Sequence, residues 1–421
     1  MRNRRQFLQT SAVSLTSLTA LQYAGAASKP NERIRLAVIG VRGRGRGLIR
    51  GFSSLKNVEI AYICDPDSNV IPRAVKEIKN QNRVPKTIPD FRDALKDKDV
   101  DAIAIATPDH WHALATILGC QAKKHVYVEK PISHNLIEGQ KMIEAARKHK
   151  RVVQVGTQRR SAAHLKKAVD YIQSGKLGKI PFVKTWIAGN RKPAPAKPNG
   201  AVPKGVNYDL WLGPAPKRPF NENHFHYKWH WFWEYGTGEL GNNGIHALDL
   251  ARWLVGLDAP NKISSGGGRY FYGDARVTPD TQVATFDFDK TCLVWEHRFW
   301  AKTGNAGAPF GVIVYGEKGT MVVTSKGWHI VDGEKHEEKA VSYELPHLQN
   351  FLDCIREGGT PNASIEEGHK STRLCHLGNI AYRTGHTLQF DAKTETLKGD
   401  AQANKLLGRT YRKGFELPRE I

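Results

Sequence analysis

A strand that runs into a glycine-rich turn, followed by a helix, a second strand and an acidic residue, constrains the fold of this chain more than any other feature. Residues 34–40 read I-R-L-A-V-I-G, an apolar strand that enters the turn G-V-R-G-R-G-R-G at Gly40 to Gly47. We expect a helix over residues 48–55 and a second strand over 58–64, directly followed by Asp65. Glycine lets the backbone turn tightly and approach a pyrophosphate, whose charge then meets the helix N-terminus. The order of these parts predicts a dinucleotide-binding Rossmann unit.

The turn departs from the ideal G-x-G-x-x-G pattern, because Arg42 occupies the position of the second glycine. Arg42 or Arg44 is therefore a candidate for a charge-assisted contact with the phosphates. Asp65 is expected to hydrogen-bond the adenine ribose and would repel a 2′-phosphate, so the sequence favours NAD over NADP. The pyrophosphate cradle itself is assigned to Gly40, Gly43 and Gly45.

Two further strands of this half end in polar residues. The strand at residues 126–131, V-Y-V-E-K-P, ends with Glu129 and Lys130, because a proline has no N–H to continue the ladder. Ligands bind outside the carboxyl ends of strands in open parallel sheets, so Lys130 is placed to reach a cofactor and its substrate together. The alternative is a surface lysine before a loop. The strand at residues 101–106 is followed by T-P-D-H-W-H, which adds Thr107, Pro108, His110 and His112 as candidate cofactor contacts, with core histidines as the alternative for the last two.

Strands and helices alternate through the rest of this half, which is typical of a parallel sheet with helices on its faces. Helices are expected at residues 69–80, 91–97, 113–122 and 136–148, and a sixth strand at 151–155. We assign residues 32–156 to a Rossmann domain. Gln158 and Arg159, just after the sixth strand, are candidate contacts for the substrate or the nicotinamide.

The first 27 residues resemble a twin-arginine export signal. An arginine pair at Arg4 and Arg5 precedes a mild apolar stretch, and small residues offer a cleavage site near Ala26 or Ala27. The alternative is an ordinary export signal in which the arginine pair occurs by chance. Since no apolar run is long enough for a spanning helix, we expect a soluble, periplasmic protein. The twin-arginine route carries folded proteins, so it favours a tightly bound cofactor.

Net charge and cysteine usage narrow the functional classes. The formal charge of +22, or +19 without the three arginines of the signal, suggests anionic surroundings such as nucleic acid, charged glycans or the cell envelope. Nucleic acid is disfavoured, because the basic residues are spread over the chain and no helix-turn-helix, RRM or zinc-finger pattern occurs. The five cysteines are scattered without a C-x-x-C pair, which indicates neither a disulfide framework nor a zinc site.

Five segments together resemble the Gfo/Idh/MocA family of oxidoreductases, named for glucose–fructose oxidoreductase and inositol dehydrogenase. They are V-I-G with its glycines, A-T-P-D-H-W-H, V-E-K-P, Q-V-G-T-Q-R-R at residues 154–160 and G-N-N-G-I-H-A-L-D at residues 241–249. The resemblance implies an N-terminal Rossmann domain and a C-terminal α/β domain whose large open, mainly antiparallel sheet often packs in oligomers. It also implies a nicotinamide cofactor, a sugar or polyol substrate, and Lys130 as the catalytic lysine.

The family's site also contains a D-x-x-x-H pattern. Its histidine falls on His246 here, while Asn242 stands where the aspartate would be. The resemblance thus implies His246 as a second catalytic group, and histidine suits acid–base work because its unperturbed pKa of about 6.5 lies near working pH. Asn242 and, at helical spacing, Asp249 are candidate substrate contacts. In this family the bond between Lys130 and Pro131 can be cis.

Residues 208–235 are rich in tryptophan and histidine. Aromatic faces stack on the apolar face of a pyranose and histidines bind its hydroxyls, so Trp211 and His226 are candidates for a carbohydrate cleft. The alternative is that alternating Trp229, Trp231 and Trp233 form one buried face of a strand or turn. A metal is disfavoured, because the histidines lack accompanying carboxylates. The preceding Pro/Lys-rich loop, residues 191–204, is either a lid or inert surface.

The rest of the second half predicts an α/β domain. Its expected strands alternate well enough for an antiparallel sheet with one buried face, and its last two helices are expected to pack against the Rossmann half. The expected strands are residues 182–188, 262–272, 281–287, 291–300, 311–316 and 320–323, and the expected helices are 162–174, 247–254, 344–357 and 369–384. We assign residues 157–392 to a substrate-binding and oligomerisation domain and 393–421 to a charged surface tail.

These observations predict an exported NAD-dependent oxidoreductase that acts on a secondary hydroxyl of a sugar, glycoside or cyclitol and assembles as a homo-oligomer, a dimer or tetramer. A second interpretation is an NAD-dependent glycoside hydrolase, in which transient oxidation at C3 acidifies the adjacent C–H, permits elimination of the substituent and ends with hydride return. It suits an exported site, where free NAD is expected to be scarce. A third is a non-catalytic sugar-binding protein, against which the intact Lys130 and Asp65 argue.

Overall fold

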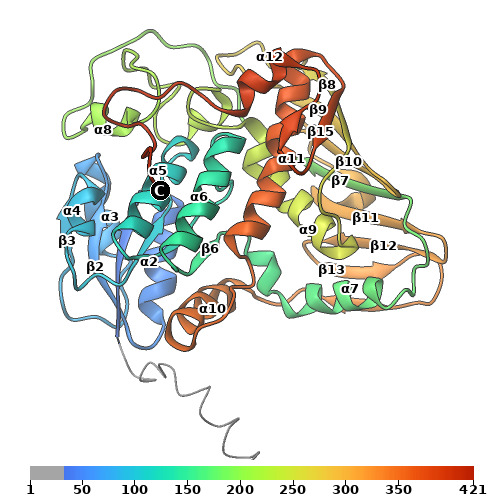
Figure 1. Ribbon diagram of the computed structural model, residues 1–421, viewed down its shortest axis with the longest axis horizontal. Coiled ribbons are helices and arrows are strands. Elements are labelled where there is room, and N and C mark those ends of the chain that lie inside the picture. Colours follow the sequence, from blue (N-terminus) through green and yellow to red (C-terminus); the bar gives the residue numbers. More distant parts are fainter. Residues whose placement is uncertain (1–32) are drawn as a thin grey trace, which may run out of the picture.

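Two β-sheets organise the protein, which we describe from a computed structural model of residues 33–421 (Figure 1). The first sheet has six strands and lies at the left of the figure, and the second has ten strands and lies at the right. The predicted export signal, residues 1–27, falls outside the described residues. Among the helices of residues 33–421 we find none with the length and apolarity that crossing a bilayer requires.

The first sheet is parallel throughout and has the strand order β3-β2-β1-β4-β5-β6, which is the order of a doubly wound Rossmann domain. Near-continuous apolar runs form its central strands, as expected for strands buried on both faces. The strands are β1 (Ile34–Ile39), β2 (Val58–Cys64), β3 (Lys86–Ile88), β4 (Ala102–Ile105), β5 (His125–Val128) and β6 (Val153–Val155).

Two helices of this half begin four residues before their predicted starts at residues 48 and 113, two begin where predicted, and the helix expected at residues 69–80 is limited to Ile71–Val75. Helix α2 (Arg44–Ser54) starts four residues before residue 48, because two of its first residues are glycines, which are poor helix formers and hid the start. Gly45 is required there nonetheless, since a Cβ would lie 1.9 Å from the carbonyl oxygen of Gly40. The other helices of this half are α3 (Ile71–Val75), α4 (Phe91–Leu95), α5 (Asp109–Gln121) and α6 (Leu136–Lys148).

Both faces of the first sheet are completed by residues from the end of the chain. On one face α10 (Glu344–Glu357) packs with α2, and Leu348 and Phe351 share a core with Phe52, as predicted for this helix. On the other face Phe415 packs at 5.6 Å edge-on to Trp111, and Ile421 is buried in the same core. Residues 393–421 are therefore not the charged surface tail that we expected. Their few apolar side chains anchor them.

The second sheet is mixed and mostly antiparallel, which confirms the predicted fold class. Its order is β14-β13-β12-β11-β7-β10-β9-β8-β15-β16, and only β7 and β10 pair in parallel within the described residues. Strand β8 ends at Gly268 and not at residue 272, because the N–H groups of Tyr270 to Tyr272 bond to the carboxylate of Asp280. The strands are β7 (Phe182–Ala188), β8 (Lys262–Gly268), β9 (Thr281–Phe288), β10 (Thr291–Arg298), β11 (Phe310–Gly316), β12 (Gly319–Thr324), β13 (Gly327–Ile330), β14 (Glu337–Lys339), β15 (Leu388–Asp391) and β16 (Thr396–Leu397).

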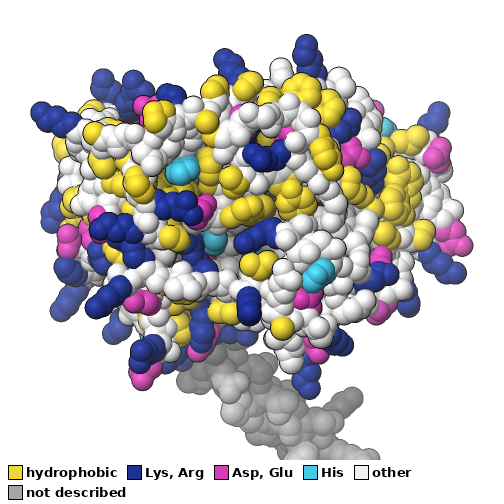
Figure 2. Space-filling view, turned by 90° about the horizontal axis from the view of Figure 1, so that it is seen from above, with side chains coloured by type: hydrophobic (Ala, Val, Ile, Leu, Met, Phe, Trp, Pro, Cys, Tyr) yellow, Lys and Arg dark blue, Asp and Glu magenta, His cyan; other side chains and the backbone are white. Residues whose placement is uncertain are grey.

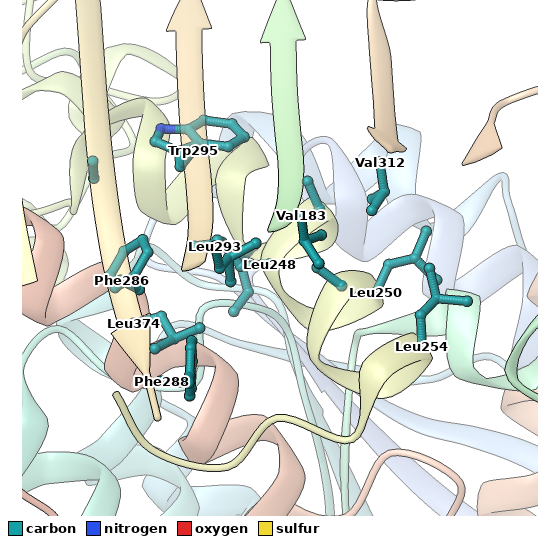
Figure 3. Packing of buried hydrophobic residues seen from close by; sticks show 14 of the residues in the cluster. Val183, Leu248, Leu250, Leu254, Phe286, Phe288, Leu293, Trp295, Val312 and Leu374 are labelled. Carbon is teal, nitrogen blue, oxygen red and sulfur yellow. The ribbon is translucent and has the colours of Figure 1, made fainter. Parts of the chain in front are cut away.

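Helices cover one face of this sheet and form the largest core. Burial alternates along β9 and β10, and the buried side chains meet α9 (Ile245–Val255), as Figure 3 shows for Leu248 beside Leu293. Each fully buried side chain of this size contributes roughly 1.5–3 kcal/mol. Helices α7 (Ala163–Gln173) and α11 (Ile365–Thr384) belong to the same layer, and two short helices, α8 (Tyr208–Leu212) and α12 (Ala401–Asn404), lie in the connections.

Candidate active site

A cavity of about 540 Å³ lies between the two domains at the carboxyl ends of the first sheet's strands. Residues that follow β1, β2, β4, β5 and β6 line one side, and residues of the second domain line the other. This is the position in which open α/β sheets bind ligands. The predicted site residues that line it are Gly40, Arg42, Gly43, Arg44, Asp65, Thr107, Pro108, His112, Glu129, Lys130, Gln158, Arg159, Trp211, His226, Asn242 and His246.

The glycine turn after β1 leaves room for a phosphate group. Gly40 has φ +78°, and a Cβ there would lie 2.7 Å from the carbonyl oxygen of Ala106. At Gly43 a Cβ would meet no atom within 4 Å, so this residue borders open space. Gly43 is also the N-cap of α2, and without a side chain it leaves the first N–H groups of the helix available to an anion. The turn therefore fits a pyrophosphate, with Gly45 packing the helix onto the strand.

The two arginines of the turn have different surroundings. Arg44 is held inside the site, because its Nε lies 2.6 Å from Glu129 and its Nη1 lies 2.7 Å from Glu344. Its guanidinium is thus occupied by protein carboxylates, which corrects the expectation that it contacts the phosphates. Arg42 is exposed, and its side chain has no ion-pair partner among residues 33–421. Of the two arginines, Arg42 is therefore the one whose charge no carboxylate of the described residues occupies.

Asp65 and Thr107 have the properties expected of cofactor contacts. The carboxylate of Asp65 accepts N–H bonds from Val41 at 2.8 Å and Asp67 at 2.9 Å, which fixes its orientation at the end of β2. Burial raises the pKa of Asp65 to about 6. The hydroxyl of Thr107 is buried and has no hydrogen-bond partner in the described part of the chain. A dinucleotide hydroxyl or amide would supply that missing partner.

The two histidines after β4 are structural. Both ring nitrogens of His110 face main-chain carbonyls, of Trp211 at 3.0 Å and Tyr235 at 3.3 Å, and the residue does not line the cavity. His112 does line it, but its ring nitrogens lie 2.7 Å from the carbonyl oxygen of Pro131 and 2.9 Å from that of Thr107. His110 is therefore a core residue. His112 joins the turns after β4 and β5 instead of offering a free nitrogen to the cofactor.

Lys130 lies two residues after β5 and points across the cavity to the second domain. Its Nζ donates to the carbonyl oxygen of Asn242 at 2.5 Å and lies 3.4 Å from the side-chain oxygen of the same residue. Burial lowers the pKa of Lys130, while the negative charges of Glu129, Asp109 and Glu239 oppose that shift. The Lys130–Pro131 peptide bond is cis. The hydrogen bond to Asn242 fixes the amine, and burial makes it release its proton more easily than an ordinary lysine does.

A buried carboxylate that the sequence did not single out, Glu239, lies behind Asn242. The amide nitrogen of Asn242 donates to Glu239 at 3.3 Å, and Arg191 donates to the same carboxylate at 3.4 Å. Burial alone would raise the pKa of Glu239, but Arg191 and the amides of Asn243 and Asn242 outweigh it, so the pKa is lowered. Glu239 thus supplies a negative charge near the position where the family pattern has aspartate. Its signal in the sequence was an acid three residues before Asn242.

His246 stands beside these groups at the start of α9. Its imidazole has no hydrogen-bond partner within residues 33–421 and lines the cavity. Burial lowers the pKa of His246 well below its usual value, and the charges of Lys130, Arg159 and Arg44 lower it further. The residues before it form a π-helical turn, Leu240–Gly244, and not the α-helix that the i, i+4 spacing assumed. Asn242 and His246 nevertheless face the same cavity.

Asp249 does not belong to the site. Its carboxylate bonds to the guanidinium of Arg160 at 2.9 Å and accepts a bond from the hydroxyl of Ser371 at 2.7 Å. Both charged side chains are almost fully buried, and neither lines the cavity. The expectation of a substrate contact was wrong, because the helical spacing carries Asp249 past the cavity and toward α11.

The aromatic segment divides between core and cavity. Trp211 packs in a cluster of buried aromatic side chains that includes Phe225 and Tyr235, yet one edge of it faces the cavity. Residues Lys228–Trp231 form a 3-10 turn and not a strand, so Trp229 and His230 stack at 3.6 Å. The segment is therefore a mostly buried aromatic cluster, and Trp211, Tyr227, Trp229 and His230 line the cavity beside it, whereas a carbohydrate cleft stays a prediction.

His226 lies at the cofactor end of the cavity. Its Nε2 is 2.9 Å from the carboxylate of Asp67, just after β2, which places it beside Arg42 and not beside Lys130. The expectation that it binds the substrate is therefore corrected. The Pro/Lys-rich loop ends nearby, where the N–H of Ser68 bonds to the carbonyl oxygen of Gly205 at 2.9 Å. In the described residues no group of three or more His, Cys, Asp or Glu is placed to hold a metal ion.

Comparisons with known proteins match both halves of the chain. Residues 34–157 match a model described as "Oxidoreductase family, NAD-binding Rossmann fold", and residues 184–417 match "Oxidoreductase family, C-terminal alpha/beta domain". An uncharacterized oxidoreductase of Bacillus subtilis (strain 168), YrbE, is 30% identical over 335 residues, which cover 77% of this chain and 84% of that protein. A glycosyl hydrolase family 109 protein of Shewanella putrefaciens is 36% identical, but over 118 residues that cover 27% of this chain and 26% of that protein.

Solved structures share the fold at low sequence identity. The WlbA dehydrogenase of Bordetella pertussis, in complex with NADH and UDP-GlcNAcA, is similar with a TM-score of 0.67 and 20% identity over 86% of this chain and 99% of that chain. A levoglucosan dehydrogenase in complex with NADH and levoglucosan is similar with a TM-score of 0.68 and 17% identity over 85% and 99%. Both likenesses support the two-domain architecture.

Proposed function

The chain belongs to the Gfo/Idh/MocA oxidoreductase family, and on that premise we propose that it is an NAD-dependent dehydrogenase acting on a secondary hydroxyl of a sugar, glycoside or cyclitol. The observation that carries the proposal is the amine of Lys130, fixed where the cofactor cradle and the second domain meet and held by Asn242. The solved neighbours with bound NADH and sugar support the substrate class.

A nicotinamide cofactor held by the Gly40–Gly45 turn and Asp65 would supply the hydride acceptor for the carbon that carries the hydroxyl. Lys130 orients the hydroxyl oxygen and stabilises the negative charge that develops on it. Because burial lowers the pKa of this lysine, the amine can hold a proton and release it more readily than an ordinary lysine does. Asn242 fixes the amine with its main-chain oxygen, so the geometry exists before the substrate arrives.

His246 is the proposed second proton acceptor. Because burial and the surrounding cations lower its pKa, the imidazole is neutral at pH 7 and can take the hydroxyl proton as hydride leaves. Its ring has no competing hydrogen bond in the described residues, so a substrate hydroxyl can reach it. Gln158 lies 3.4 Å from Glu129 beside the same space and is proposed to orient the substrate.

For the cofactor we propose NAD and not NADP, tightly held. Asp65 would meet a 2′-phosphate with a carboxylate, and its two N–H bonds prevent it from turning away. Arg42 is the proposed partner of the pyrophosphate. We further propose export through the twin-arginine route, from the N-terminal sequence features, and assembly as a homo-oligomer, from the family resemblance.

A second candidate is a redox-neutral glycoside hydrolase that uses the same cofactor. The partial match to a glycosyl hydrolase family 109 protein favours it, over a segment of 118 residues. In that case the same lysine and histidine would serve a transient oxidation at C3, and the substituent would leave before the hydride returns.

The discriminating experiment mixes protein purified from its own compartment with a panel of sugars and their aryl glycosides. NADH absorbance and release of the aryl alcohol are followed together, and the bound nucleotide is identified by mass spectrometry. A stoichiometric rise of NADH supports the dehydrogenase, and aryl release without net NADH supports the hydrolase. Sugar binding with neither signal means a non-catalytic protein and refutes both.

A further inference from the structure

Arg159 stands out among the arginines that are at least partly buried near the cavity, because no carboxylate in the described part of the chain balances its charge. Arg44 is paired with Glu129 and Glu344, Arg160 with Asp249, and Arg191 with Glu239. Arg159 is half-buried and lines the cavity, yet its guanidinium has neither an ion pair nor a hydrogen bond with any residue of the range 33–421. Buried charges in proteins are normally paired, so such a cation needs a partner from outside the chain.

An aromatic ring holds Arg159 in place. Its guanidinium carbon lies 4.0 Å from the centre of the Phe310 ring, a cation–π contact that fixes one face of the planar group. Burial lowers the pKa of Arg159, which remains charged at any physiological pH. With one face covered, the N–H groups along the edge stay available to an acceptor with two oxygens.

The location of Arg159 assigns it to the substrate and not to the cofactor. It follows β6 and faces the second domain, and its charge acts on His246, the group next to Lys130. The phosphate cradle lies after β1, where the N-terminus of α2 and Arg42 already provide positive charge. An anion bound at Arg159 would therefore belong to the molecule that is oxidised.

We propose that Arg159 binds an anionic substituent of the sugar, a carboxylate or a sulfate ester, so that the substrate is an acidic sugar. This inference rests on the proposed function for the reaction itself. A guanidinium offers a rigid fork that matches two oxygens of a carboxylate or of a sulfate. The excess of lysine and arginine side chains, spread over the face seen in Figure 2, gives the whole molecule the sign that attracts such substrates.

The test compares matched sugars that differ only in charge. NAD-loaded protein is titrated by calorimetry with glucose, glucuronate and glucose 6-sulfate, and with galactose and galacturonate. We expect at least one acidic member to bind about ten- to hundredfold more tightly than its neutral counterpart, and added salt to weaken only the acidic member. The carboxylate and sulfate arms identify which anion is preferred.

Three variants locate the effect. Arg159→Gln should bring acidic and neutral sugars to equal affinity and leave NAD affinity unchanged, while Arg159→Lys should keep part of the preference because it keeps the charge. The matched control is Arg383→Gln, which removes an arginine that also lies over an aromatic ring, 5.2 Å from Trp233, outside the cavity. It should behave as the unsubstituted protein. Circular dichroism verifies that each variant is folded.

The outcomes separate this inference from the proposed function. No preference for an acidic sugar in any pair, or a preference that survives without change in folded Arg159→Gln protein, overturns the inference. NADH formation from neutral sugars, with acidic sugars no better as substrates in the unsubstituted protein, overturns it while the dehydrogenase stands. Arg159-dependent binding of glucuronate without NADH formation or bond cleavage leaves the anion site standing and overturns the proposed function.

Discussion

Replacing Lys130 by methionine tests the centre of the site. Methionine has nearly the same length and shape but neither charge nor donor, so the variant removes the amine that contacts Asn242 at 2.5 Å and leaves the space filled. Loss of a positioned acid–base group costs about 10²- to 10⁴-fold in turnover, which corresponds to about 3–5 kcal/mol in the barrier. NAD affinity should persist, because the cradle lies after β1 and not at the end of β5.

Folding stability should change much less than turnover. The carbonyl oxygen of Asn242 loses its donor, at a cost of about 1–3 kcal/mol, but a charged amine no longer has to be buried, which offsets part of that cost. The matched control is Lys124→Met. Lys124 is a buried lysine whose Nζ donates to the carbonyl oxygen of Asp97 at 2.7 Å, outside the cavity. It carries the same chemical change without the catalytic role.

The assay measures steady-state turnover, NAD affinity and thermal unfolding for both variants. We expect a large loss of turnover in Lys130→Met alone, at unchanged NAD affinity. Turnover within tenfold of the unsubstituted enzyme in folded Lys130→Met would refute the assignment. Equal losses in Lys130→Met and Lys124→Met would show that the effect is one of packing.

Three other substitutions test the remaining assignments. His246→Ala should lower turnover and flatten the acidic limb of the pH–rate profile. Asn242→Asp adds a negative charge that raises the pKa of the imidazole, so it should move the same limb to higher pH. Unchanged profiles in both variants would mean that His246 is structural. Asp65→Asn should reduce the ratio of the NADP and NAD dissociation constants roughly tenfold. In the unsubstituted protein the same preference for NAD should weaken as the pH falls below about 6, where Asp65 becomes protonated. Asp249→Ala should lower the free energy of unfolding by about 3 kcal/mol in urea titrations, because the buried Arg160 then keeps only the partly exposed Glu367 as an ionic partner, while the KM of the folded enzyme stays unchanged.

The parts of the site that sequence reasoning found are those whose chemistry leaves a local trace. A pyrophosphate needs glycine where the backbone approaches it, so Gly40 and Gly45 can be recognised from their spacing and from the strand before them. Lys130 is marked by the proline that ends its strand. The Rossmann domain follows from such signals, since each lies within a few residues of the next.

The parts that were missed depend on contacts between distant residues. In the sequence His110 resembles a site histidine, but in the fold its Nε2 is hydrogen-bonded to the carbonyl oxygen of Trp211, 101 residues later. Asp249 looks like a substrate contact until Arg160, 89 residues earlier, neutralises it. Nothing in the local pattern of either residue carries this information, because a three-dimensional neighbour decides whether a polar side chain is free or already satisfied.

The way the end of the chain closes the first sheet bears on when this protein can fold. Helix α10 covers one face of the Rossmann sheet, and Phe415 and Ile421 complete the core on the other. Domains near an N-terminus commonly fold while the ribosome is still at work. Here the first half emerges early but lacks one covering until α10 has been made and the other until residues 415–421 have been made. The core of the first half is therefore complete only when segments from both halves of the sequence are present, and a truncation before Phe415 would destabilise the half that is made first.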